Sequence, residues 1–181
     1  MIEGKLVNLR ALEMRDVERV HRWMNDREVT EHLNMRYPVS VGAEEAYVSG
    51  IASRAISFDA PFFAIETKDG THIGGVKFHR TSAEDHSALL GISIGDKTHW
   101  TRGYGTDAII TLLRFAFDEM NLHRVELTVQ ATNERARACS RKCGFVDEVL
   151  MRRAAYAHGG YIDEWVMGVL RAEFYALHGA S

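Results

Sequence analysis

The sequence predicts an α/β fold of the α+β kind, in which a mixed central sheet is flanked by helices. Residues 62–94 contain three alternating apolar and polar segments separated by polar turns, which is typical of antiparallel strands. Residues 105–120 then carry apolar side chains at helical spacing, and another alternating segment follows at residues 123–129. A strand, a helix and a second strand in this order place the two strands side by side and parallel.

The chain begins with a predicted strand and an amphipathic helix. Residues 6–10 alternate as a strand does, and residues 13–25 carry Val17, Val20 and Met24 at helical spacing. We therefore expect a strand that leads directly into a helix with one apolar face.

The next segment is less regular. Residues 27–39 show no clear period, after which Ser40 is expected to cap a second helix. Glu44 and Glu45 fall in its first turn, and we expect both to be solvated charges. Trp23 lies beside the apolar face of the preceding helix and is expected in the core, with the wall of a ligand pocket as the alternative.

The sheet elements follow in order. Residues 62–67 and 71–80 are expected to pair around a Lys68-Asp69-Gly70 turn, and residues 88–94 continue the meander. After the helix and the parallel strand, we expect a short helix at residues 133–142 and a hairpin of residues 145–156 and 161–170. Residues 171–181 are expected to form a short helical or frayed tail.

Composition limits the class of protein. The length of 181 residues suits one domain spanning residues 1–181. A net charge of −3 argues against direct nucleic-acid binding and against binding to an anionic membrane. No apolar run approaches the roughly 20 residues of a membrane span, so we expect a cytoplasmic protein. The two cysteines, Cys139 and Cys143, are expected to be reduced, and the nine histidines show no metal-ligand spacing, so no metal is expected.

The segment between the strand at 88–94 and the helix at 105–120 is the candidate binding loop. Glycines at the start of a helix let the backbone approach a ligand, and the first turn presents N–H groups that have no partner within the helix. An anion is expected there, although the glycines could serve only to turn the chain. The residues concerned are Thr101, Arg102, Gly103, Tyr104, Gly105 and Thr106.

A dinucleotide site is the competing interpretation of this loop. Residues 103–108 also fit the pattern Gly-x-Gly-x-x-Gly/Ala. In a dinucleotide fold, however, an acidic residue is expected near the end of the next strand, and that strand ends at Val129 and Gln130 without one.

Residues 133–145 distinguish these two interpretations of the loop, an anion site at the helix start and a dinucleotide site. They resemble the second signature of the GNAT acyltransferases, in which Asn precedes a small residue, a short helix and Lys-x-Gly-Phe. The loop then resembles the Gln/Arg-x-x-Gly-x-Gly/Ala pyrophosphate cradle of that superfamily, with Trp100 at the usual Gln/Arg position and Arg102 as a substitute cation. The resemblance is closest to the branch that contains ribosomal-protein alanine and spermidine N-acetyltransferases.

The resemblance implies a donor site. In GNAT proteins the two parallel strands splay apart, and the pantetheine arm of acetyl-CoA pairs with exposed main chain, here that of Ile92, Ser93 and Ile94. Residues 101–106 would hold the pyrophosphate. Asn133 matches a cofactor-contacting Asn, and capping of the helix that follows is an alternative role.

The implied reaction is direct attack of a primary amine on the acetyl thioester, for which the ammonium group must lose a proton. Some relatives carry a catalytic Glu at the position of Thr128. Glu126 lies one pleat away on the same face and is the candidate base, with a solvent-facing or ion-paired role as the alternative. Many relatives use a Tyr seven residues after the Asn as the acid, a position that Ser140 occupies here. Ser140 could act through water, Tyr104 or Tyr156 could replace it, or the thiolate could leave unassisted.

The expected function is therefore an acetyl-CoA-dependent N-acetyltransferase. The acceptor is expected to be a peptide N-terminus, with a small amine or polyamine as the alternative. A non-catalytic CoA-binding module is the competing class, and a dinucleotide oxidoreductase ranks third. A homodimer is common in the resembled branch.

Overall fold

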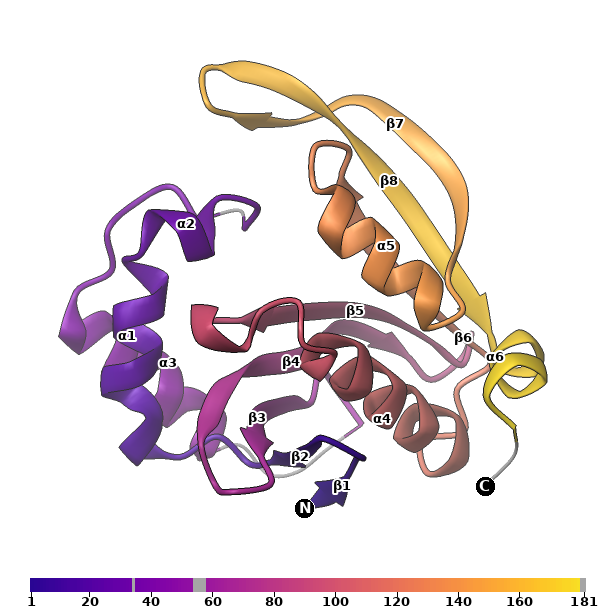
Figure 1. Ribbon diagram of the computed structural model, residues 1–181, viewed down its shortest axis with the longest axis horizontal. Helices are drawn as coiled ribbons and strands as arrows, with labels where there is room; N and C mark the ends of the chain where they lie inside the picture. Colours follow the sequence, from indigo (N-terminus) through magenta and orange to yellow (C-terminus); the bar gives the residue numbers. More distant parts are fainter. Residues whose placement is uncertain (34, 54–57, 180–181) are drawn as a thin grey trace.

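The computed structural model describes residues 1–33, 35–53 and 58–179. Within these residues the strands form one eight-stranded sheet with the order β1-β2-β3-β4-β5-β6-β8-β7 (Figure 1). The strands are β1 (Ile2–Glu3), β2 (Val7–Arg10), β3 (Phe62–Thr67), β4 (His72–Ser82), β5 (Ser87–Ile94), β6 (Arg124–Gln130), β7 (Val146–Ala157) and β8 (Gly160–Leu170). The helices are α1 (Val17–Met24), α2 (Arg27–Thr30), α3 (Val41–Ala52), α4 (Tyr104–Asp118), α5 (Glu134–Lys142) and α6 (Arg171–His178).

The predicted fold class is confirmed. Neighbouring strands pair antiparallel, except that β5 and β6 pair parallel through the connecting helix α4. The periodicity did not indicate the short strand β1 or the single-turn helix α2. No helix in the described part of the chain is long and apolar enough to cross a membrane.

The parallel pair is short. β5 and β6 pair at only three positions, the last of which joins Leu89 to Glu126. Beyond that point β6 continues to pair with β8, whereas β5 continues to pair with β4. Strands β5 and β6 therefore diverge, as the resemblance implied, and leave a gap that is closed at Leu89 and opens toward Ile94.

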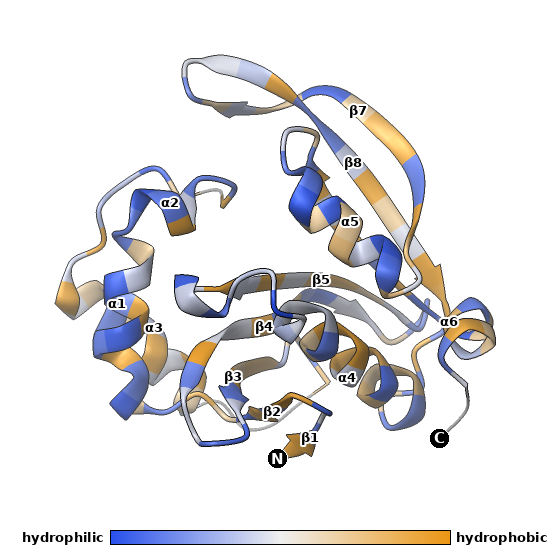
Figure 2. Ribbon diagram, viewed as in Figure 1, coloured by the Kyte–Doolittle hydropathy of each residue, from blue (hydrophilic) through white to orange (hydrophobic). Residues whose placement is uncertain are grey.

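Helix α4 covers one face of the sheet and packs its apolar side into the main core (Figures 1 and 2). Its side chains Leu112, Leu113 and Phe117 are fully buried. Asp107 in its first turn is also buried, and its carboxylate accepts hydrogen bonds from the backbone N–H groups of Lys5, Leu6 and Val7 at 3.2, 2.7 and 3.0 Å. This side chain thus joins the start of the chain to the start of α4.

Helices α1 and α3 pack together on the opposite face. The hydroxyl of Ser40 accepts a hydrogen bond from the N–H of Ala43, so the predicted cap is confirmed. The expectation that Glu44 is solvated is wrong: its side chain is only 3% exposed, and burial raises its pKa. Trp23 is buried, as expected for a core residue, and a Cβ at Gly95 would lie 2.1 Å from its ring.

Candidate functional site

Helix α4 begins with uncapped N–H groups. Gly103 occupies the N-cap position at φ 88°, a left-handed conformation that favours glycine, and it has no side chain to accept a hydrogen bond. The first backbone bond into the helix joins the N–H of Asp107 to the carbonyl of Gly103 at 2.9 Å. The N–H groups before it, on Tyr104, Gly105 and Thr106, therefore have no capping side chain.

The space over this helix start is open. A Cβ placed on Gly105 would meet only the Cγ1 of Ile94 at 3.7 Å and the Sγ of Cys139 at 4.0 Å, both ordinary contacts. The uncapped N–H groups and the positive end of the helix dipole together suit an anion such as a pyrophosphate. The predicted loop residues thus form a cradle that fits the phosphate part of a CoA thioester.

Trp100 anchors the loop to the sheet. Its indole Nε1 donates a hydrogen bond to the carbonyl of Ile94 at 2.7 Å, and the guanidinium of Arg135 lies 4.1 Å from its ring centroid. Arg102 is exposed, and no hydrogen bond within the described residues engages it. Sequence reasoning missed Arg135 as a cation near the cradle. Its position two residues after the predicted cap Asn133 places it in the first turn of α5, which is the signal that could have found it.

Beyond the closed end of the gap, strand β5 has main-chain groups that no longer pair with β6. Ile92, Ser93 and Ile94 pair with β4, but β6 has already diverged from them. Because successive backbone groups of a strand point to opposite edges, alternate N–H and C=O groups here face the gap. One of them, the carbonyl of Ile94, is occupied by Trp100.

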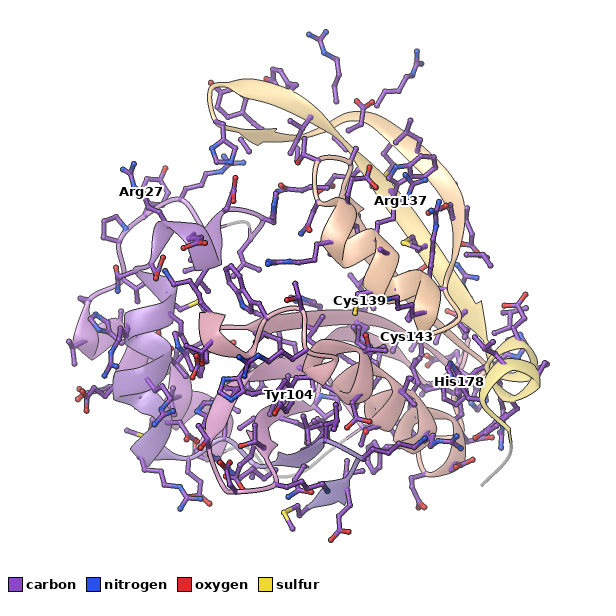
Figure 3. The ribbon with its side chains drawn as sticks, in the orientation of Figure 1. Arg27, Tyr104, Arg137, Cys139, Cys143 and His178 are labelled. Carbon is purple, nitrogen blue, oxygen red and sulfur yellow. The ribbon has the colours of Figure 1, made fainter. Side chains whose placement is uncertain are left out.

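Helix α5 closes the cradle from the other side. The Asn133 side chain accepts a hydrogen bond from the N–H of Ala136 at 3.0 Å, so this residue does cap the helix. Among the described residues its amide NH₂ donates to no group. Cys139 lies 3.3 Å from the hydroxyl of Thr106, at the junction of α5 and α4 shown in Figure 3. A hydrogen bond between the two thiols lowers the pKa of Cys139 and raises that of Cys143.

The two predicted catalytic residues have protein partners. Glu126 lies at the closed end of the gap, where its two carboxylate oxygens contact the guanidinium groups of Arg80 at 3.3 Å and Arg124 at 3.4 Å. Ser140 is 3% exposed, and its hydroxyl donates to the carbonyl of Ala136 at 3.0 Å.

A cleft lies at the open end of the gap. Its volume is about 410 Å³, and it is formed by residues of segments 24–33 and 35–38 together with Gln130 and the tip of the β7–β8 hairpin. A second hollow of about 440 Å³ adjoins it and shares Glu31, Ala157 and His158. The walls are joined by a contact between the Nδ1 of His32 and the Oε1 of Gln130 at 3.2 Å. Sequence reasoning did not find this cleft, because residues 27–39 carry no motif.

The charges around the cleft are mainly positive. Arg27 on α2 (Figure 3) and Arg36 line it, and Arg36 donates a hydrogen bond to the carbonyl of Tyr156 at 3.1 Å. Glu31 supplies the one carboxylate among the residues described as lining either hollow. A ligand in the cleft therefore meets two guanidinium groups and one carboxylate.

Comparisons with known proteins agree with this site. The family model for the acetyltransferase (GNAT) domain matches residues 7–146. A spermidine N(1)-acetyltransferase of Vibrio cholerae is 27% identical over 169 residues, which cover 93% of this chain and 95% of that protein. A putative ribosomal N-acetyltransferase of Bacillus subtilis, YdaF, is 29% identical over 106 residues, covering 59% of this chain and 57% of that protein.

A solved structure extends the comparison to the fold. The Vibrio cholerae spermidine N-acetyltransferase in complex with CoA and spermine superposes with a TM-score of 0.81 at 27% identity, over 93% of this chain and 98% of that one. The matched family model includes both the cradle and the diverging strands. The chain belongs to the GNAT acetyltransferase family, whose acetyl donor is acetyl-CoA.

Proposed function

We propose that this protein transfers the acetyl group of acetyl-CoA to the primary amine of a peptide N-terminus bound in the cleft. The observation that carries the proposal is the continuity of three features: the uncapped start of α4, the gap between β5 and β6, and the cleft at the open end of that gap. A donor bound in the cradle and an acceptor bound in the cleft would meet within the gap.

The donor would be held mainly by the backbone. Residues 101–106 would bind the pyrophosphate through N–H groups, with Arg135 and Arg102 as nearby cations. The free edge of Ile92, Ser93 and Ile94 would pair with the pantetheine amides, and the amide NH₂ of Asn133 would donate to the cofactor.

Acid–base chemistry would fall to Glu126 and Ser140 on the sequence interpretation. The contacts of both residues compete with that role, because the carboxylate of Glu126 is already engaged by the guanidinium groups of Arg80 and Arg124. A buried hydroxyl that already donates to a carbonyl has no further proton to offer a departing sulfur. Their substitution is therefore a test of the proposal and not a premise of it.

The charge of the cleft favours a peptide over a polyamine. A polyamine carries several positive charges, and Arg27 and Arg36 would repel them with only Glu31 in opposition. The relation to spermidine N-acetyltransferases keeps a polyamine as the second candidate. A peptide has one ammonium group, and its carbonyl groups or acidic side chains would accept hydrogen bonds from the two arginines.

We also propose that residues 1–181 act as one catalytic domain in the cytoplasm. A single sheet that spans the described residues supports one domain, and the free thiols of Cys139 and Cys143 fit a reducing compartment. Exposed apolar side chains on the edge strand β7, Val149 and Leu150, suit a homodimer contact, which light scattering would test.

The test of the proposed function is release of free CoA thiol when the purified protein is mixed with acetyl-CoA and a panel of amines. The panel contains peptides with neutral, acidic and basic residues after the N-terminus, together with spermidine. We expect faster thiol release with neutral or acidic peptides than with spermidine, and mass spectrometry should locate the acetyl group on the N-terminal nitrogen. Preference for spermidine would overturn the choice of acceptor.

A further inference from the structure

We propose that His79 is a catalytic residue, the base that accepts a proton from the acceptor's ammonium group at the closed end of the gap between β5 and β6. This inference rests on the proposed function, since it concerns the proton that an amine acceptor must lose. Three observations support it: a bulge in β4, the position of the imidazole over Gly91, and the face of the sheet on which both lie.

The bulge makes His79 an extra residue in its strand. Phe78 pairs with Leu90, and Arg80 pairs with Leu89, so His79 has no partner of its own in β5. Bulges of this kind bend a strand, redirect a side chain and are frequent next to active sites. Here the redirected side chain is an imidazole.

The imidazole lies directly over the backbone of Gly91. A Cβ at Gly91 would be 2.3 Å from the Nε2 of His79, so a side chain at this position would exclude the ring from where it lies. Gly91 stands two residues beyond Leu89, the last position at which β5 pairs with β6. The ring is therefore at the beginning of the gap, close to its closed end.

This position is where the reacting carbon is expected. The cradle lies beyond Ile94, at the open end of the gap, and the strands close at Leu89. A pantetheine chain that enters from the cradle and runs along β5 consequently carries its thioester toward Gly91.

The imidazole and the cleft share a face of the sheet. Phe78 and Leu90 pack in the core beneath α4, whereas Lys77, opposite Gly91, donates to the hydroxyl of Tyr47 on α3 at 3.5 Å. On β6, Val125, Leu127 and Val129 pack in that same core, which puts the alternate residue Gln130 on the other face with the cleft. The register that joins Leu89 to Glu126, if extended, would set Gly91 level with Thr128, two residues or about 7 Å along the strand from Gln130.

The surroundings of His79 favour its neutral form. The residue is exposed, and desolvation of the covered part of its ring, followed by the positive charge of Lys77, lowers its pKa below that of a free imidazole. The neutral form, which can accept a proton, therefore predominates at pH 7. The other charged groups nearby, Arg80 and Glu126, are paired with each other at 3.3 Å. No hydrogen bond or ion pair with the described residues occupies the ring of His79.

The proposed step balances its protons. The neutral imidazole takes one proton from the ammonium group, and the resulting amine nitrogen forms a bond to the thioester carbonyl carbon while the carbon–sulfur bond breaks. The second proton that the nitrogen loses passes to the departing sulfur and gives the CoA thiol. His79 then releases its own proton to solvent, so the net products are an amide, CoA and one proton.

The test compares pH–rate profiles of kcat/KM for the wild type, His79→Gln and the control His123→Gln, with the best acceptor of the panel. His123 is an exposed histidine directly before β6 and outside the site, so its substitution should change nothing. We expect His79→Gln to lower kcat/KM at pH 7 by about 10²-fold and to recover at high pH, where the amine loses its proton unaided. CoA affinity should not change.

Gly91→Ala provides an independent test, because the added Cβ displaces the imidazole without removing it. It should lower kcat/KM in the wild-type background and cause little further loss in the His79→Gln background. Equal losses in both backgrounds would contradict the inference.

The outcomes distinguish a failure of the role of His79 from a failure of the proposed function. If the wild type transfers acetyl groups and His79→Gln shows the same fall of kcat/KM toward low pH as the wild type, the role of His79 is overturned and the proposed function stands. If that fall disappears in Glu126→Gln while His79→Gln behaves like the wild type, Glu126 is the base instead. If the wild type acetylated no amine, the proposed function and the role of His79 would both fail.

Discussion

Replacing Gly105 by valine tests the phosphate cradle without disturbing the fold. The position does not have a left-handed φ, and a Cβ there makes only ordinary contacts, at 3.7 Å to Ile94 and 4.0 Å to Cys139. Valine and glycine differ by less than about 1 kcal/mol in helix propensity. We therefore expect the free energy of unfolding to change by no more than about 1 kcal/mol.

Binding of CoA should respond very differently. The two methyl groups of valine would occupy the space over the uncapped N–H groups of Gly105 and Thr106. Loss of two hydrogen bonds to a charged group, at about 1.5–3 kcal/mol each, amounts to about 3–6 kcal/mol. A loss of that size raises the Kd for CoA more than about 10²-fold.

Calorimetric titration with CoA measures this effect, and thermal denaturation checks the fold. Gly42→Val is a matched control, because Gly42 is also the second residue of its helix and a Cβ there meets nothing within 4 Å. The control should bind CoA like the wild type. A folded Gly105→Val protein with the Kd of the wild type would refute the placement of the pyrophosphate at the start of α4.

Four further predictions follow from the contacts. Asp107→Ala should lower the free energy of unfolding by about 3 kcal/mol or more in chemical denaturation, because three backbone N–H groups lose their acceptor; an unchanged denaturation midpoint would contradict this. Arg135→Ala should raise the Kd for CoA about tenfold in calorimetry, as expected for one lost partly exposed cation; an equal Kd would exclude Arg135 from the cradle. Glu126→Gln should lower kcat less than about tenfold, below the usual range for a general base, since its carboxylate is held by two arginines; a larger loss that recovers at high pH would make it the base. Ser140→Ala should lower kcat by a similarly small factor, under about tenfold, and Ser140→Tyr should keep or raise kcat if the ring fits; a fall of about 10³-fold in folded, CoA-binding Ser140→Ala would identify the acid.

Local patterns predicted the fold well. Alternation located the meander of β3, β4 and β5, and the helical spacing of α4 implied that β5 and β6 run parallel. Ser40 and Asn133 were recognisable as caps because a short polar side chain before a helix has a direct chemical reason to be there. These features depend on neighbours in the sequence, which a single sequence displays.

The features that depend on distant contacts were not visible. Glu44 is buried because α1 packs over it, although a charged residue in a first turn usually faces solvent. Asp107 lies in the first turn of α4, and its three backbone partners are about a hundred residues away, so its neighbours in the sequence do not reveal them.

The candidate site divides in the same way. The glycines of the cradle and the Asn-to-Phe signature predicted the donor site that we propose, because backbone recognition demands particular residues at fixed spacing. The proposed acceptor cleft joins residues of segments 24–33 and 35–38 to the tip of the β7–β8 hairpin, and none of these segments has a motif. His79 gains its position from a bulge, which a strand pattern does not reveal.

The most direct test of the central claim is simultaneous measurement of CoA thiol and acetylated peptide. The account predicts equal amounts of both products with an N-terminally free peptide, and neither product with the same peptide blocked at its N-terminus. Tight binding of acetyl-CoA without thiol release, for every peptide and for spermidine, would contradict the account and leave a protein that binds the donor without transferring its acetyl group.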